Sequence, residues 1–310
     1  MDLAAYFARI GHAGDTAPTL ATLTALHEAH AAAIPFENVD VLVGRLPSLD
    51  PADLEDKLVR RRRGGYCYEQ NLLLLTALRA LGFTVRPLLA RVRFRRPPGA
   101  VMPRTHLLLL VEIAGRPFIA DVGFGGLGLL EPLPLQADTV FAFPLVSFRL
   151  LREGDAWVLQ GDDGTGWGDL HTFNLDRQEL ADIEMSNFYT ATHSGSPFRR
   201  ALTAQRVRRE ERTILRDNTL VRLRPDGRTE HPIATEAGAR AALADHFGLI
   251  LPDDVRLPER LFAMGVAEHV PDRNAAHARL MTRLEQGQDL RGERFNREVL
   301  YNKHQPEGRD

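Results

Sequence analysis

The sequence holds one cysteine, Cys67, in a setting that suits a nucleophile. Gly64 and Gly65 precede it and allow a tight backbone turn, and an apolar stretch after it predicts a helix over Cys67–Ala80. Cys67 therefore falls in the first turn of that helix, where unpaired backbone N–H groups and the positive end of the helix dipole favour a thiolate. The alternative is a buried structural cysteine, the commoner role of a lone cysteine.

A thiolate nucleophile works with a base and a group that orients the base, and one predicted hairpin offers both. The segments on either side of Ala114-Gly115 have strand character, and these two residues form a two-residue turn. In that register Asp121 lies opposite Leu108, so His106 shares its face of the sheet, diagonal to Asp121. A slip of one residue would separate them. The sequence thus predicts a Cys67-His106-Asp121 site, the alternative being a surface histidine and a turn aspartate.

Capping and turn residues predict the elements that position these groups. Helices are expected over Leu3–Ile10, over Pro18–Ala33, after the cap Asp50 and over Cys67–Ala80. Strands are expected in Val85–Phe94, Thr105–Val122, Phe148–Leu151, Ala156–Leu159 and His171–Asn174. A hairpin at Pro225-Asp-Gly227 and a helix between Thr235 and Gly248 follow. Helices, then strands, then a mixed segment indicate an α+β fold.

Four segments resemble motifs of the arylamine N-acetyltransferases: Ile34-Pro-Phe-Glu-Asn38, Arg63-Gly-Gly-Tyr-Cys-Tyr-Glu-Gln-Asn71, Thr105-His106 and Asp121-Val-Gly-Phe-Gly125. The resemblance extends from Tyr6 to about residue 250. It implies an N-terminal helical bundle over 1–84, a central β-barrel over 85–199 and a C-terminal α/β lid over 200–270, around a cysteine-protease-like Cys-His-Asp core. Residues 271–310 then form a polar C-terminal extension beyond the family's usual length.

The same resemblance implies what the site binds. Acetyl-CoA is the expected co-substrate, and an arylamine, arylhydroxylamine or hydrazine is the expected acceptor, with acetyl-cysteine as the intermediate of a ping-pong reaction. No metal is expected. The implied substrate-binding residues are Phe36, Val92 and Phe124, and the implied CoA-binding residues are Thr105, Gly125 and Gly126. Arg63 is expected beside the nucleophile, where it pairs with Glu37. A monomer or a homodimer is expected.

Composition limits the partners. The 310 residues carry 39 Lys and Arg against 41 Asp and Glu, a formal net charge of −2, which argues against a nucleic-acid or anionic-membrane partner. No apolar run is long enough to span a membrane, and the first residues lack a secretory apolar region, so a cytoplasmic protein is expected. A single cysteine excludes an internal disulfide and a multi-cysteine metal site.

Two short motifs are weaker than they look. Gly123–Gly128 matches the dinucleotide-binding pattern, but prolines follow where that pattern needs a helix, so a flexible glycine loop beside the triad is expected instead. His27 and His30 are three residues apart, whereas a zinc-binding helix of the HExxH type needs a spacing of four. A solvated helix face is expected there.

Rival functions remain at this point. An amide synthase of the same family, closing a macrolactam from a carrier-bound polyketide thioester, would use an identical triad. A transglutaminase-like or papain-like hydrolase has Cys, His and Asp in the same chain order. A peptidase assay without CoA-dependent activity would indicate the hydrolase, and polyketide-synthase neighbours would indicate the amide synthase. A non-catalytic scaffold would require the three triad residues to be accidental.

Overall fold

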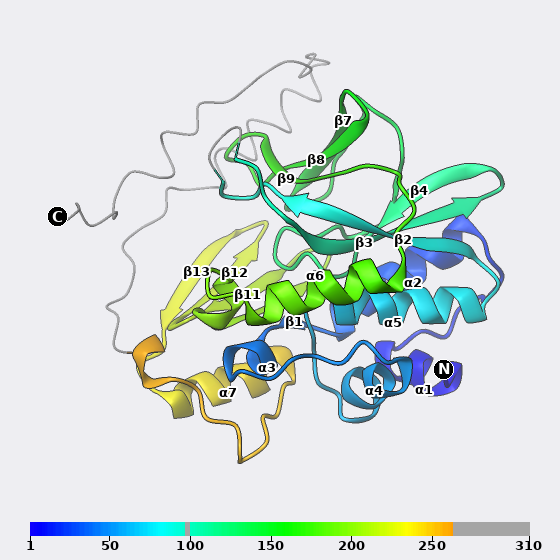
Figure 1. The fold of residues 1–310 in the computed structure, drawn as a ribbon. Coiled ribbons are helices and arrows are strands. Elements are labelled where there is room, and N and C mark those ends of the chain that lie inside the picture. The colour runs from blue at the N-terminus through cyan, green and yellow to red at the C-terminus, as the bar shows by residue number, and fades with distance from the viewer. Residues whose placement is uncertain (97–99, 263–310) are drawn as a thin grey trace.

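The structure is a computed structural model that describes residues 1–96 and 100–262 (Figure 1). Helices from the first third of the chain lie beneath a large antiparallel sheet, and a smaller sheet with the last helix stands beside them (Figure 1). The fold is of the α+β class, as expected. The predicted extension 271–310 and the end of the predicted lid lie outside the described residues, and the division into four domains stays a prediction.

The first helices lie close to their predicted ranges, and Asp50 is the cap that the sequence predicted. Helix α1 (Leu3–Ile10) is capped by the Asp2 carboxylate and ends at Gly11, whose φ of 71° is left-handed. Helix α2 (Leu20–Ala33) begins after Thr19. Asp50 caps the short α4 (Pro51–Leu54), which continues as a π-helix, η1 (Glu55–Arg60). The sequence did not predict this π-helical continuation.

Helix α5 (Cys67–Ala80) lies at the centre of the helical layer, with Cys67 as its first residue. It contacts α1, α2 and α4 on one side and β2 and β3 of the large sheet on the other. Almost every side chain from Cys67 to Leu78 is buried. The long apolar run in this segment therefore reflects a helix enclosed on all sides.

The large sheet curls into a nearly closed barrel. Its order is β5-β4-β3-β2-β9-β8-β7-β6, and the two edge strands are joined through residues 135–139 alone. Its strands are β2 (Thr84–Val92), β3 (Arg104–Ile113), β4 (Arg116–Ala120), β5 (Leu133–Pro134), β6 (Val140–Phe141), β7 (Ser147–Glu153), β8 (Ala156–Asp162) and β9 (Gly168–Phe173).

The hairpin of β3 and β4 has the predicted register. Ile113 pairs with Arg116, and Leu109 pairs with Ala120. The turn residues Ala114 and Gly115 have φ values of 50° and 74°, both left-handed, as the type I′ turn requires. Because this turn fixes the register, His106 and the residue just after β4, Asp121, face the same side.

The smaller sheet pairs a strand from the N-terminal part of the chain with four strands from the C-terminal part of the described chain. Its order is β1-β10-β11-β12-β13, from β1 (Phe36–Glu37), β10 (Thr203–Val207), β11 (Arg212–Arg216), β12 (Thr219–Arg224) and β13 (Gly227–Pro232). The short helix α3 (Val39–Leu42) and α7 (Glu236–Phe247) pack on it through a shared apolar cluster. Thr235 and Gly248 cap α7 as predicted.

Helix α6 (Leu180–Thr192) was not expected from the sequence. It lies against β3 and a 3₁₀ turn, η2 (Pro197–Arg199); a second such turn, η3 (Glu259–Leu261), comes near the end of the described chain. The buried polar residues Ser186 and Asn187 of α6 form hydrogen bonds with the hydroxyl groups of the tyrosines on either side of Cys67. Polar residues at inward positions hide this helix from a hydrophobic-periodicity search.

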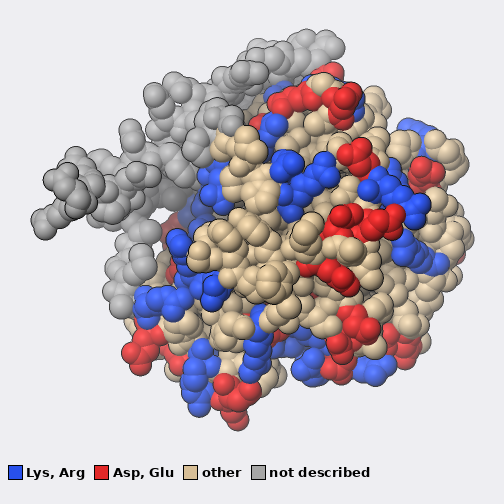
Figure 2. Space-filling model, viewed as in Figure 1, with Lys and Arg blue, Asp and Glu red and all other residues tan. Residues whose placement is uncertain are grey.

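The surface reflects the near-neutral composition. On the face shown in Figure 2, basic and acidic side chains are interspersed over most of the area. Among the described residues, no helix combines the length and the apolar character needed to cross a membrane.

Candidate active site

The thiol of Cys67 lies where the first turn of α5 meets the start of β3. Cys67 is 3% exposed, and its Sγ donates a long hydrogen bond of 3.9 Å to the backbone oxygen of Thr105. The pKa of the neighbouring His106 is raised, mainly by Asp121 and in addition by its interaction with the Cys67 side chain. The single cysteine and the predicted histidine therefore lie beside each other.

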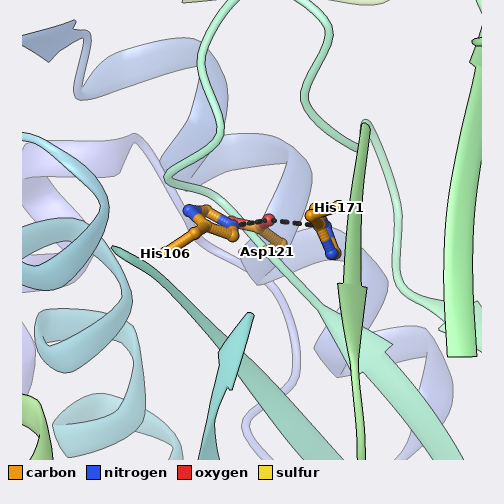
Figure 3. Close-up of side chains that lie close together, drawn as sticks. All are labelled: His106, Asp121 and His171. Atoms are coloured by element: carbon orange, nitrogen blue, oxygen red, sulfur yellow. Dashed lines mark hydrogen bonds and ion pairs between the residues drawn. The ribbon is translucent and has the colours of Figure 1, made fainter. Parts of the chain in front are cut away.

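His106 and Asp121 form the closest polar contact of the site (Figure 3). The distance from His106 Nε2 to Asp121 Oδ2 is 2.6 Å, and both side chains are buried. Burial opposes a charge on either group, but the attraction between them outweighs it, so the pKa of His106 is raised and that of Asp121 is lowered. An imidazolium-carboxylate pair is the favoured state. Because Nε2 faces Asp121, Nδ1 is the ring nitrogen available to Cys67.

Asp121 is held by two residues of the quoted motifs to which the sequence analysis assigned no role. Its Oδ1 accepts hydrogen bonds from Asn71 Nδ2 and from the backbone N–H of Gly123, each 2.9 Å long. Asn71 also donates to Leu107 O and accepts from the Val122 N–H, so one side chain of α5 links both strands of the hairpin. A buried polar side chain four residues after the cysteine, one turn along its helix, was the available signal.

His27 fixes the backbone of the same residue. Its Nε2 accepts the backbone N–H of Asp121 at 3.1 Å, and its Nδ1 bonds to Leu130 O at 3.0 Å. His30 is equally enclosed, with Tyr6 and Gln70 on its two nitrogens. The expectation of a solvated helix face was wrong: both histidines are fully buried, because α2 is covered by α1, α5 and β10.

A glycine loop follows Asp121 and passes very close to Cys67. A Cβ at Gly123 would come within 2.7 Å of Cys67 Cα, so only glycine fits there. Gly125, with φ of 92°, and Gly126 both lie against the Gln205 side chain, which accepts the N–H of Gly126. The loop contains no helix, as expected, and the two implied CoA-binding glycines lie in it.

The three implied substrate-binding residues occupy different places. The ring of Phe124 lies 5.1 Å from that of His106, nearly perpendicular to it. Phe36 stands in β1 and lines a small cavity together with Asp121. Val92 lies at the end of β2 and pairs with His171 of β9. Of the three, Phe124 makes a direct ring contact with His106.

A buried ion network surrounds the start of α5. We call it the helix-start network and define it as Glu37, Asp40, Lys57, Arg63 and Glu69. Arg63 pairs with Glu37 at 2.6 Å, as expected, and Lys57 bridges Asp40 at 2.5 Å and Glu69 at 2.6 Å. Glu69 Oε2 in turn accepts the backbone N–H of Tyr66, the residue before the cysteine. The network therefore fixes the backbone that presents the thiol.

The sequence and the fold are both similar to known proteins. The sequence profile of the N-acetyltransferase family matches residues 19–255. An arylamine N-acetyltransferase of Escherichia coli (strain K12) is 49% identical over 197 residues, 64% of this chain and 70% of the relative. One of Mycolicibacterium smegmatis is 40% identical over 259 residues, 82% of this chain and 94% of the relative. The solved arylamine N-acetyltransferase of Mycobacterium marinum in complex with CoA has a TM-score of 0.77 at 38% identity, covering 80% of this chain and 92% of that one.

Proposed function

The chain belongs to the arylamine N-acetyltransferase family, and we propose that it moves an acetyl group from acetyl-CoA to an arylamine, arylhydroxylamine or hydrazine through an acetyl-Cys67 intermediate. One observation carries the proposal: Cys67, at the start of a helix, contacts a histidine whose other side is 2.6 Å from Asp121. Nucleophile, base and orienting group thus follow one another in contact.

In the first half-reaction Cys67 acts as the nucleophile. Its thiolate attacks the thioester carbonyl carbon, a new carbon–sulfur bond forms, and the bond to the CoA sulfur breaks. His106 then gives its Nδ1 proton to the departing CoA thiolate, which leaves as the free thiol. One thioester replaces another, so the step is nearly isoergic. Backbone N–H groups at the start of α5 are available to stabilise the oxyanion that forms on the carbonyl oxygen.

In the second half-reaction His106 acts as the base. It takes a proton from the amine as the amine nitrogen attacks acetyl-Cys67, the amide bond forms, and Cys67 leaves as a thiolate beside the restored imidazolium. Asp121 keeps the ring oriented and stabilises its charged form. Both half-reactions use the same sulfur, so ping-pong kinetics follow.

Substrate recognition is part of the proposal. Phe124 lies beside His106 and is proposed to contact the acceptor ring, and Phe36 and Val92 are proposed as further acceptor contacts. Thr105, Gly125 and Gly126 are proposed to contact CoA. The relative from Mycobacterium marinum was solved in complex with CoA, and this likeness supports the choice of donor.

The test is CoA release from acetyl-CoA with a panel of arylamines and hydrazines, comparing wild type with Cys67→Ala. Wild type should release CoA in proportion to the acetylated amine, and rapid quenching should trap protein heavier by one acetyl group. Cys67→Ala should do neither. Hydrolysis of a peptide substrate, with no CoA release in the amine assay, would contradict the proposal in favour of a hydrolase.

A further inference from the structure

A third titratable side chain, His171, joins the His106–Asp121 pair. The sequence analysis gave it no role beyond a strand position. His106 reaches Asp121 from β3, and His171 reaches it from β9 (Figure 3). The distance from His171 Nε2 to Asp121 Oδ2 is 3.8 Å, and one ligand atom from each of the three residues lies within 4.8 Å of the others.

His171 is unusual because it is buried without a hydrogen-bond partner. Its side chain is fully buried, and neither ring nitrogen has a partner among the described residues. Its ring packs against His106 and Phe124, at 5.0 and 5.4 Å between centroids. A buried polar side chain without a partner requires an explanation, and a bound ion is one of the standard explanations.

The three donors form a recognised ligand set. Two imidazoles and one carboxylate bind Zn²⁺ and leave a fourth position open. The other carboxylate oxygen of Asp121 is fixed by Asn71 and Gly123, the support that metal-binding carboxylates usually have.

We propose that His106, Asp121 and His171 bind one divalent transition-metal ion of the zinc type, and that the bound ion switches the triad off. Two ligand atoms that share a zinc ion lie about 3.3–3.6 Å apart, given bonds of about 2.0–2.2 Å. The His106–Asp121 distance must therefore open from 2.6 Å, and the Asp121–His171 distance must close from 3.8 Å.

Metal binding and catalysis exclude each other because they use the same atoms. The ion takes the lone pair of His106 Nε2, and the proton that Nε2 donates to Asp121 passes to solvent. The hydrogen bond that orients the base is then lost. The inference goes beyond the proposed function and depends on it only where loss of transferase activity is measured.

Calorimetric titration of the full-length, chelator-treated protein with Zn²⁺ tests the proposal. One equivalent should bind to wild type, and His171→Phe should weaken binding at least about 100-fold, since one of three ligands is gone. Cys67→Ser should bind as wild type does, because the sulfur lies on the other side of the His106 ring. His246→Phe, which removes a partly exposed histidine of α7, is the matched control and should also bind normally.

Co²⁺ as a probe gives a readout that needs no variant. Wild-type protein should show visible d–d bands without a thiolate-to-cobalt charge-transfer band. Zn²⁺ should also inhibit CoA release in wild type, with recovery on adding chelator. If His171→Phe does not fold, binding of Zn²⁺ by His171→Gln and the cobalt spectrum of the wild type test the site instead. Unchanged binding in folded His171 variants, a thiolate band, loss of binding in Cys67→Ser, or no binding by wild type would each overturn the proposal.

Discussion

Helix α5 begins between two buried polar regions of opposite character. The helix-start network holds five charged side chains, and each has an opposite charge within 3.4 Å. On the reactive side, the Cys67 sulfur has one backbone contact at 3.9 Å and a histidine beside it. The many strong contacts fix the backbone of the helix start, whereas the Cys67 sulfur, the proposed nucleophile, is held weakly. The comparison indicates that positioning and reactivity are assigned to different residues.

This division predicts two kinds of variant. Substitutions on the reactive side should reduce the rate and leave the free energy of unfolding nearly unchanged. Substitutions in the network should lower the free energy of unfolding and change the rate only through the fraction of folded protein. A variant that changes both quantities strongly would break the comparison.

The largest effect is expected for Cys67→Ser. A hydroxyl is far less ionised than a thiol at neutral pH, so CoA release should fall by more than about 10⁴-fold. The melting temperature should stay within a degree or two of wild type, since the two side chains are similar in size. An activity assay and calorimetry on one preparation measure the rate and the melting temperature. Near-normal turnover would show that Cys67 is not the nucleophile.

Asp121→Asn should follow, with a rate loss on the order of 10⁴-fold, because an amide neither stabilises the imidazolium nor selects its tautomer. Single-turnover acetylation measures this loss. Activity within tenfold of wild type would mean that Asp121 is structural. The matched variant Asp162→Asn changes a buried aspartate elsewhere in the barrel and should keep the transferase rate of the folded protein.

Lys57→Met tests the network. The substitution leaves the buried Glu69 without its cation and leaves the half-buried Asp40 with Arg63 alone, which should cost about 3–5 kcal/mol of unfolding free energy. Arg61→Met, which breaks an exposed pair with Asp56, should cost about 1 kcal/mol or less. Urea unfolding measures both. An equal loss of unfolding free energy in the two variants would show that the helix-start network does not stabilise the fold more than a surface ion pair does.

Phe124→Ala should have a smaller effect, confined to the acceptor. Loss of a good ring pair costs about 0.5–1.5 kcal/mol, or up to about tenfold in the arylamine half-reaction, while acetylation of Cys67 continues. Single-turnover kinetics of each half-reaction, measured separately, distinguish these steps. Equal loss in both steps, together with a lower melting temperature, would leave Phe124 as a packing residue.

The last prediction concerns the pH dependence of stability and the buried His30 of α2. Burial lowers the pKa of His30 to about 3, whereas an unfolded histidine titrates near 6.5. Between these values the unfolded chain binds the proton and the folded chain does not. The free energy of unfolding should therefore fall as pH is lowered from about 6.5, by about 1.4 kcal/mol per pH unit for each such histidine. His30→Gln should make this slope shallower by one proton, and an unchanged slope would contradict the assignment.

Local signals in the sequence predict part of this arrangement. The Ala114-Gly115 turn fixes the hairpin register through its backbone geometry alone, and the register then brings His106 to Asp121. The glycines before Cys67 and the apolar run after it similarly fix the start of α5. Each of these inferences depends on residues close together in the chain, where turn and capping preferences are decisive.

The unpredicted parts depend on contacts between distant segments. His171 reaches Asp121 because β9 pairs with β2, and nothing local specifies that pairing. His27 is buried because three elements enclose α2, so its polar side chain is satisfied by backbone groups far along the chain. A polar residue can be exposed or buried, depending on which elements pack around its own helix or strand. That packing is a property of the whole fold and cannot be read from the local sequence.

The pairing of β1 with β10 has a consequence for synthesis on the ribosome. Glu37 of β1 pairs with Ala204 of β10, and the side-chain oxygen of Asn38 accepts the backbone N–H of Thr203. At about 5–20 residues per second, translation makes β1 roughly 10–30 s before its partner strand. During that interval the nascent chain exposes an unpaired strand edge next to the cysteine-bearing helix. A chain released early, before β10, therefore lacks this edge pairing and is a substrate for chaperones and proteases.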